Sequence, residues 1–177
     1  VLANINNIEN REVLLTSAFE PDVAEIMQKV NDQTKIIFVC SPNNPTGNSF
    51  TEEKVLEILN SFHGLVVIDE AYIDFSEQES WLKKLQQFPN LVITQTLSKA
   101  YGMAGIRLGL CYSSAEITAI LNKIKPPYNV NELTQTRALK RVLNLDKVQL
   151  EVTDILEERA FLHKALLQVN FVQEVYK

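Results

Sequence analysis

Three short runs of apolar, mostly β-branched residues decide what this chain can fold into. They cover 34–40 (TKIIFVC), 65–69 (LVVID) and 91–96 (LVITQT), and each is continuous rather than alternating. A strand that is apolar on both faces must be buried on both faces, as in a parallel sheet between helices. Stretches with helical spacing separate the runs. We therefore predict an α/β fold, a three-layer α/β/α arrangement around a mostly parallel sheet.

Weaker signals surround these runs. One helix is expected behind Pro21, a second after the N-cap residue Thr51, and a third over 79–87. Helical spacing dominates beyond Ser113, above all in the amphipathic pattern of 145–168. Short strands are predicted over 12–15 (EVLL), 106–112 (IRLGLCY) and 171–177 (FVQEVYK).

Composition excludes several classes of function. The net charge of −5 gives the chain no attraction to nucleic acid or to anionic membranes, and no apolar run approaches the length of a membrane span. Cys40 and Cys111 lie among apolar strand residues, so we expect buried free thiols and a cytoplasmic location. His63 and His163 are far apart and no metal-binding spacing occurs, so no metal site is predicted.

Polar side chains stand at the end of each of the three apolar runs or shortly after it. The carboxyl ends of neighbouring parallel strands meet at one edge of a sheet, where α/β proteins bind their ligands. If the three strands are neighbours, an amide, a carboxylate, hydroxyls and a lysine converge on one pocket. In chain order these residues are Asn43, Asn44, Asp69, Glu70, Thr96, Ser98 and Lys99.

Each of these residues alone also has an ordinary structural explanation. Asn44 before a proline can build a turn, Asp69 can cap a helix, and Lys99 can be a solvated loop residue. Arg107 can be a surface charge, and Tyr72 a half-buried wall residue. The functional interpretation depends on their occurring together.

Together they form a recognisable pattern. The segments NNPTG (43–47), DEAYIDF (69–75) and TLSKAYGMAGIRLG (96–109) resemble, in this order, the fold-type I pyridoxal-phosphate aminotransferases. The resemblance extends from Val13 to the end of the chain. No GxxxxGK[ST] or GxGxxG segment occurs, which disfavours a nucleotide-binding domain.

The resemblance implies pyridoxal 5'-phosphate as the cofactor and assigns the site residues. Lys99 carries the cofactor through a desolvated amine and moves the proton during transamination, while Asp69 pairs with the pyridine nitrogen. Asn44 and Tyr72 match the positions that hydrogen-bond the hydroxyl group of the cofactor ring. The expected catalytic residues are Lys99, Asp69 and Tyr72. The positions that bind the cofactor phosphate match Thr96, Ser98 and Arg107. The Asn44–Pro45 bond is expected to be cis.

The resemblance also implies a domain organisation and a partner. Residues 1–125 correspond to the central part of the cofactor-binding large domain, and 126–177 to a helical connection and the beginning of a small C-terminal domain. The first residue is Val1 rather than methionine, so we expect an excerpt of a longer protein, inactive by itself. Relatives are homodimers, and a homodimer is expected here.

The sequence around these site residues suggests one branch of the family. CSPNNPTG (40–47), DEAYIDFSE (69–77) and KPPYNVN (125–131) look most like the histidinol-phosphate branch, although the last segment is equally a plain loop capped by Asn131. This branch transfers an amino group between L-histidinol phosphate and 2-oxoglutarate in histidine biosynthesis, giving imidazole acetol phosphate and glutamate. Threonine-phosphate decarboxylase and other class I/II aminotransferases are the alternatives. A non-catalytic α/β binding module is disfavoured, because it has no physical need for Lys99 together with Asp69.

Overall fold

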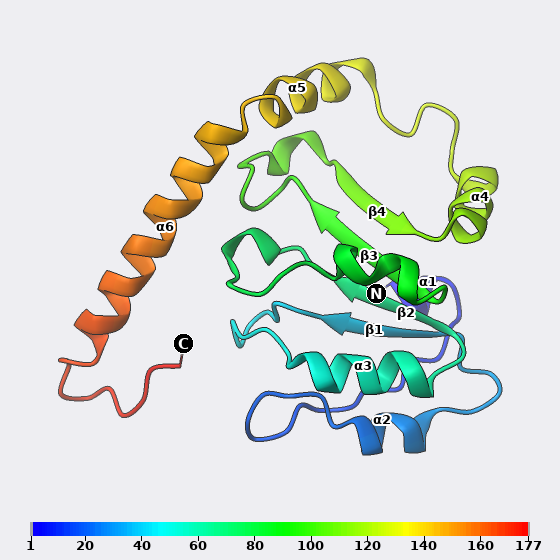
Figure 1. Cartoon of the computed structure of the whole chain (residues 1–177), viewed down its shortest axis with the longest axis horizontal. Coiled ribbons are helices and arrows are strands. Elements are labelled where there is room, and N and C mark those ends of the chain that lie inside the picture. The colour runs from blue at the N-terminus through cyan, green and yellow to red at the C-terminus, as the bar shows by residue number, and fades with distance from the viewer. Residues whose placement is uncertain (1, 177) are drawn as a thin grey trace.

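The computed structural model describes residues 2–176 and contains one four-stranded sheet with helices around it (Figure 1). The strands are β1 (Ile36–Cys40), β2 (Leu65–Asp69), β3 (Leu91–Thr96) and β4 (Gly109–Ser113). The α-helices are α1 (Leu2–Ile5), α2 (Val23–Lys29), α3 (Glu52–Ser61), α4 (Ala115–Ile124), α5 (Glu132–Val142) and α6 (Leu145–Leu166). Three 3₁₀ segments are η1 (Ile73–Phe75), η2 (Trp81–Gln87) and η3 (Ala104–Ile106).

The sheet confirms the central prediction. Its order is β1-β2-β3-β4, and the first three strands are parallel, with Ile68 of β2 opposite Val39 of β1 and Ile93 of β3. β4 runs antiparallel to β3. The fold is therefore α/β with a mostly parallel sheet, and the three apolar runs form its three parallel strands.

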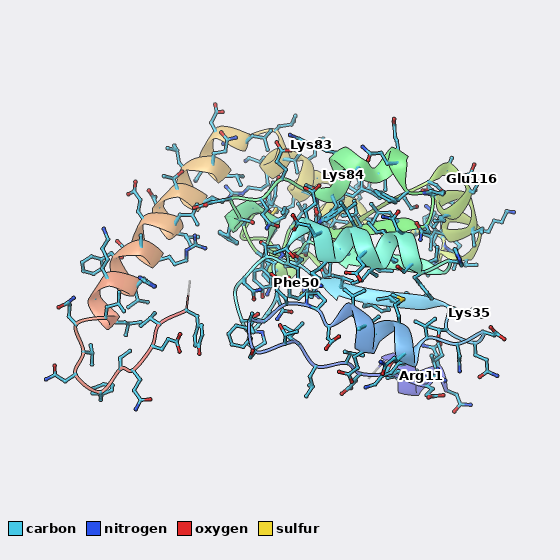
Figure 2. The ribbon with its side chains drawn as sticks, turned by 60° about the horizontal axis from the view of Figure 1, so that its bottom comes forward. Arg11, Lys35, Phe50, Lys83, Lys84 and Glu116 are labelled. Atoms are coloured by element: carbon cyan, nitrogen blue, oxygen red, sulfur yellow. The ribbon has the colours of Figure 1, made fainter. Side chains whose placement is uncertain are left out.

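One face of the sheet carries the main core. Val55 and Ile58 of α3 belong to one hydrophobic core with side chains of β1, β2 and β3, and α2 lies beside α3 (Figure 1). Phe50, just before α3, joins this core, and Figure 2 shows it within the outline of the ribbon, whereas Lys35 lies at the edge. The buried core residues of the strands are Val39, Val66, Ile68, Leu91 and Ile93.

The prediction that helices cover both faces is wrong for β1. Ile36 is 45% exposed and Phe38 74% exposed, whereas Val39, which points to the opposite face, is buried. Side chains of a strand alternate between the two faces, and within residues 2–176 no helix buries the Ile36–Phe38 side.

The helical prediction beyond Ser113 is confirmed by α4, α5 and α6. α6 runs along the side of the sheet at which β1, β2 and β3 end (Figure 1). Of its predicted apolar stripe Val148 is buried, while Leu145, Ile155 and Leu162 remain exposed. In the described part of the chain, no helix combines the length and the apolar character that crossing a membrane requires.

Three of the predicted local elements differ in the structure. Residues 12–15 form no strand, because the chain turns back at once and Leu15 makes only an isolated bridge to Pro21. The described part of 171–177, which ends at residue 176, also forms no strand. The segment 79–87 is helical but forms the tighter 3₁₀ helix η2.

The remaining differences lie around β4. The predicted strand 106–112 begins only at Gly109, because Arg107 adopts a left-handed conformation with φ 54°. Cys111, on this strand, is exposed and Cys40 is half-buried, so the prediction of buried thiols is wrong, although both are free. β4 is one of the two edge strands, and its first three residues, Gly109 to Cys111, are all exposed.

Candidate functional site

The loop after β1 is held in one shape by its own polar groups. The Ser41 N–H donates to the Asp69 carbonyl at 3.0 Å, and the Ser41 hydroxyl accepts from the Phe50 N–H at 2.9 Å. The Asn44–Pro45 bond is cis, as predicted, and so is Ser41–Pro42, which was not predicted. These contacts fix the position from which the Asn44 side chain leaves the loop.

Asn43 and Asn44 are adjacent in the chain but form hydrogen bonds with different partners. Asn43 Nδ2 donates to Thr46 Oγ1 at 2.7 Å, and Thr46 in turn donates to Asn48 Oδ1 at 2.6 Å. Asn43 thus belongs to the loop scaffold rather than to the predicted pocket. Asn44 Nδ2 instead reaches out of the loop and donates to Tyr72 Oη at 3.0 Å.

Asn44, Tyr72 and Lys99 are brought together by the ends of three different strands. Tyr72 follows β2, and its ring centroid lies 5.0 Å from Lys99 Nζ, which follows β3. An ammonium group at this distance is attracted by the electron-rich ring face. The predicted convergence of an amide and a lysine at the carboxyl edge of the sheet is confirmed for these residues.

Asp69 lies between them, at the end of β2. Its Cα is opposite Cys40 of β1 and Thr94 of β3, so it occupies the middle of the parallel edge. Its Oδ1 accepts the Ala71 N–H at 3.1 Å, and within residues 2–176 Oδ2 accepts no hydrogen bond. A half-buried carboxylate with a free oxygen suits a cationic N–H donor.

Lys99 sits in a closed loop between β3 and β4. The Gly102 N–H donates to the Lys99 carbonyl at 2.9 Å, and Gly102 has a φ of +65°, which favours glycine. The Met103 N–H closes the loop on the Leu97 carbonyl at 2.9 Å. Lys99 is exposed in this structure, so the expected desolvation of its amine is not seen among the described residues.

α5 anchors this loop from outside. Arg141 Nε donates to the Tyr101 carbonyl at 3.0 Å, and Thr134 Oγ1 donates to the Ile106 carbonyl at 3.3 Å. Ala138 packs with Leu97 and Met103 in a small second core. Arg141 and Thr134 were not predicted from the sequence, because nothing in a single sequence relates them to a loop about 30 to 40 residues earlier.

The three predicted phosphate-binding residues are less closely associated. Thr96 Oγ1 accepts the Ser98 N–H at 3.1 Å, which joins two of them. Arg107 Nη1 donates to the Ala104 carbonyl at 2.9 Å and lines a hollow of about 220 Å³ beside Asn131. Among the described residues no hydrogen bond joins the Arg107 side chain to Thr96 or Ser98, and the role of the three residues in phosphate binding remains a prediction.

Glu70 does not belong to the predicted pocket. It is 1% exposed, and its carboxylate bonds to Ser80, Trp81 and Gln95. Successive residues at the end of a strand point to opposite sides, so Asp69 and Glu70 serve different surroundings.

Taken together, the geometry offers an amine, a phenol with its amide partner, and a carboxylate at one edge of the sheet. This donor set fits a planar, positively charged ring with a hydroxyl substituent better than a metal ion. Within residues 2–176 no group of three or more His, Cys, Asp or Glu side chains is arranged to hold a metal. A larger hollow of about 560 Å³ lies between the 101–106 segment and α5–α6 and includes none of the predicted site residues.

Comparison with known proteins gives consistent matches. The family model for aminotransferase class I and II matches residues 1–174. A histidinol-phosphate aminotransferase of Flavobacterium johnsoniae is 65% identical over 176 residues, which cover 99% of this chain and 50% of that protein. One of Christiangramia forsetii is 63% identical over 177 residues, 100% of this chain and 51% of that protein.

The fold is found in a solved structure. The crystal structure of the histidinol-phosphate aminotransferase from Clostridium acetobutylicum matches with a TM-score of 0.88 at 23% identity, over 99% of this chain and 54% of that one. The chain spans about half the length of the curated relatives it matches.

Proposed function

Because this chain belongs to the family of class I and II aminotransferases, we propose that it carries a central part of a pyridoxal-phosphate active site. The reaction proposed is amino transfer between L-histidinol phosphate and 2-oxoglutarate, giving imidazole acetol phosphate and glutamate in histidine biosynthesis. The curated relatives at 65% and 63% identity bear the name of this enzyme, which supports the proposal. The observation that carries it is the meeting of Asn44, Tyr72 and Lys99 at the ends of separate strands.

Asn44, Tyr72 and Lys99 each have a defined role in the proposed reaction. Pyridoxal phosphate, when bound, supplies an electron-withdrawing ring that stabilises negative charge at the substrate α-carbon. Lys99 Nζ would hold the cofactor and, once free, would take the proton from that carbon and deliver it to the cofactor carbon that had bound Nζ, which is the proton shift that amino transfer requires. The Tyr72 ring holds the Lys99 side chain beside the edge of the sheet. The Tyr72 hydroxyl, oriented by Asn44, would donate to the hydroxyl group of the bound cofactor.

Asp69 and the phosphate-binding residues complete the proposed site. The Oδ2 of Asp69, which has no other donor among residues 2–176, would accept from the protonated pyridine nitrogen of the bound cofactor and so would keep the ring electron-poor. The hydroxyls of Thr96 and Ser98 and the guanidinium of Arg107 supply donors for a phosphate dianion. The Thr96 oxygen that accepts from the Ser98 N–H still has its own proton to donate.

Lys99 is tested by labelling. The full-length protein is mixed with pyridoxal phosphate, reduced with borohydride and digested, and the pyridoxyl-bearing peptide is located by mass spectrometry. We expect the label on Lys99, its loss in Lys99→Ala, and its retention in the control Lys83→Ala, an exposed lysine on η2. A label on any other lysine of the wild-type protein contradicts the assignment.

The reaction branch is tested with substrates. We expect glutamate when L-histidinol phosphate and 2-oxoglutarate are supplied, and no CO₂ from O-phosphothreonine. CO₂ release without glutamate would make the protein a threonine-phosphate decarboxylase, because which bond breaks depends on substrate orientation above the ring.

We further propose a cytoplasmic homodimer whose ligands are small phosphorylated amines and dicarboxylates rather than nucleic acid. The free thiols of Cys40 and Cys111 and the net charge of −5 support this environment and ligand class. The dimer rests on the resemblance to homodimeric relatives. Light scattering of the full-length protein tests it, and a monomeric mass contradicts it.

A further inference from the structure

Glu70 is the one charged side chain that is buried among residues 2–176. Its Oε2 accepts from the Ser80 hydroxyl at 2.6 Å and from Gln95 Nε2 at 2.8 Å, and its Oε1 accepts from the Trp81 N–H at 2.7 Å. Burying a carboxylate is costly unless such donors compensate for the lost water. Both oxygens are compensated here, so the carboxylate forms a well-defined junction between three segments.

The junction closes the loop that carries Tyr72. This loop leaves β2 at Glu70 and returns to Glu70 at Ser80 and Trp81, so the two ends of the loop are tied by one side chain. Gln95 ties the same point to β3, one residue before Thr96. The loop is therefore fixed relative to the two strands whose ends supply Asp69 and Lys99.

Backbone hydrogen bonds in the first turn of the loop connect the fixed position of Glu70 to that of Tyr72. The Ile73 N–H donates to the Glu70 carbonyl at 3.1 Å, and the Phe75 N–H donates to the Tyr72 carbonyl at 3.0 Å. Only Ala71 separates Glu70 from Tyr72, so a displacement of the junction displaces the Tyr72 ring. Such a displacement would break two contacts of Tyr72. Its hydroxyl oxygen lies 3.0 Å from Asn44 Nδ2, and its ring centroid lies 5.0 Å from Lys99 Nζ.

We propose that Glu70 is a positioning residue, which holds Tyr72 where its hydroxyl meets Asn44 and its ring faces Lys99. The inference rests on the proposed aminotransferase function for its effect on rate. Its structural part, the tie between the loop and the strands, stands on the contacts of Glu70 alone.

The structural part is tested in the cofactor-free, full-length protein. In Glu70→Ala we expect the Trp81 amide and the 71–80 segment to exchange hydrogen faster than in the wild type, because the Trp81 N–H loses its acceptor. Glu70→Gln should restore slow exchange, since its amide oxygen can accept from Trp81 while its NH₂ donates to a flipped Gln95 amide. Glu77→Ala, an exposed carboxylate of the same loop, is the matched control without effect.

The catalytic part is tested by a double-mutant cycle with Tyr72→Ala, which removes both the hydroxyl and the ring. A displacement of about 1 Å at a reacting group costs on the order of 10²-fold in rate. We therefore expect Glu70→Ala to lower kcat by about this factor with a smaller change in KM, and Glu70→Gln to recover most of it. If Glu70 acts through Tyr72, the double variant Glu70→Ala/Tyr72→Ala is hardly slower than the slower single variant.

Several outcomes overturn the inference. Unchanged exchange at Trp81 in Glu70→Ala, or rate losses that simply multiply in the double variant, show that Glu70 does not position Tyr72. If Glu70→Ala does not fold, Ser80→Ala removes one neutral donor from the junction and must show the same coupling to Tyr72 in weaker form. A wild-type protein that does not transaminate refutes the proposed function, whereas the exchange experiment still decides whether Glu70 ties the loop.

Discussion

Ile68 is the residue at which the packing of the sheet can be tested most sharply. It is 0% exposed, sits on the central strand β2 between Val39 and Ile93, and faces the core built by α3. Shortening Ile68 to alanine removes three buried carbon groups, which at about 0.8 kcal/mol each amounts to about 2.4 kcal/mol. The cavity left behind adds to this, so the local free energy of unfolding should fall by about 2–5 kcal/mol.

Hydrogen exchange measures this loss without assuming that the whole protein unfolds in one step. We expect the amides of 65–69 in Ile68→Ala to exchange at least about 30-fold faster than in the wild type, since every 1.4 kcal/mol is tenfold. Ile68→Val removes one carbon group and should cost only about 0.5–1.5 kcal/mol. The two variants form a graded series at a single site and so control for each other.

Activity should respond much less than stability. The Ile68 side chain points to the face opposite that of Asp69, because successive residues of a strand alternate. We expect Ile68→Ala to keep most of the wild-type rate at a temperature where it is folded. Equal exchange rates in the alanine and valine variants would refute the claim that β2 is tightly packed against α3, and a lost rate in folded Ile68→Ala would refute the separation of the two faces.

Two further predictions concern α5 and the cysteines. Arg141→Ala removes the hydrogen bond to the Tyr101 carbonyl, so the local free energy of unfolding of the Lys99 loop should fall by about 1.5–3 kcal/mol, measured by hydrogen exchange of residues 99–106. Glu151→Gln removes only the ion pair with Arg141 and should lower it less. Equal losses in the two variants contradict this expectation. Arg141 lowers the pKa of Glu151, so the contribution of the pair is present above the ordinary glutamate pKa and is lost as the pH falls through the lowered value. Burial raises the pKa of both thiols, so their alkylation should be slow at neutral pH and faster in alkali. Cys111 is the more exposed of the two and should be labelled before Cys40 in a time course followed by mass spectrometry. Labelling of Cys40 first contradicts the exposure of these thiols in the structure.

Prediction from the sequence was best where burial on both sides of the backbone dictated local structure. The runs 65–69 and 91–96 coincide with β2 and β3, because continuous β-branched residues bounded by turn formers can be satisfied only inside a sheet. It was poorest where a strand depends on its neighbour. Residues 12–15 have the composition of a strand, but within residues 2–176 they have no strand partner beyond the bridge at Leu15, and so they form no strand.

For the site, the sequence by itself determined which chemical groups the strand ends carry and in which order. The parallel pairing of β1, β2 and β3 follows from the same apolar runs, so the meeting of Asn44 and Lys99 at one edge was predictable. The tertiary structure alone decided which of two adjacent carboxylates faces that edge. Asp69 does, whereas Glu70 turns into the protein because its donors come from positions 10, 11 and 25 residues further along the chain. Such partners are brought close only by folding, and no local pattern encodes their distance.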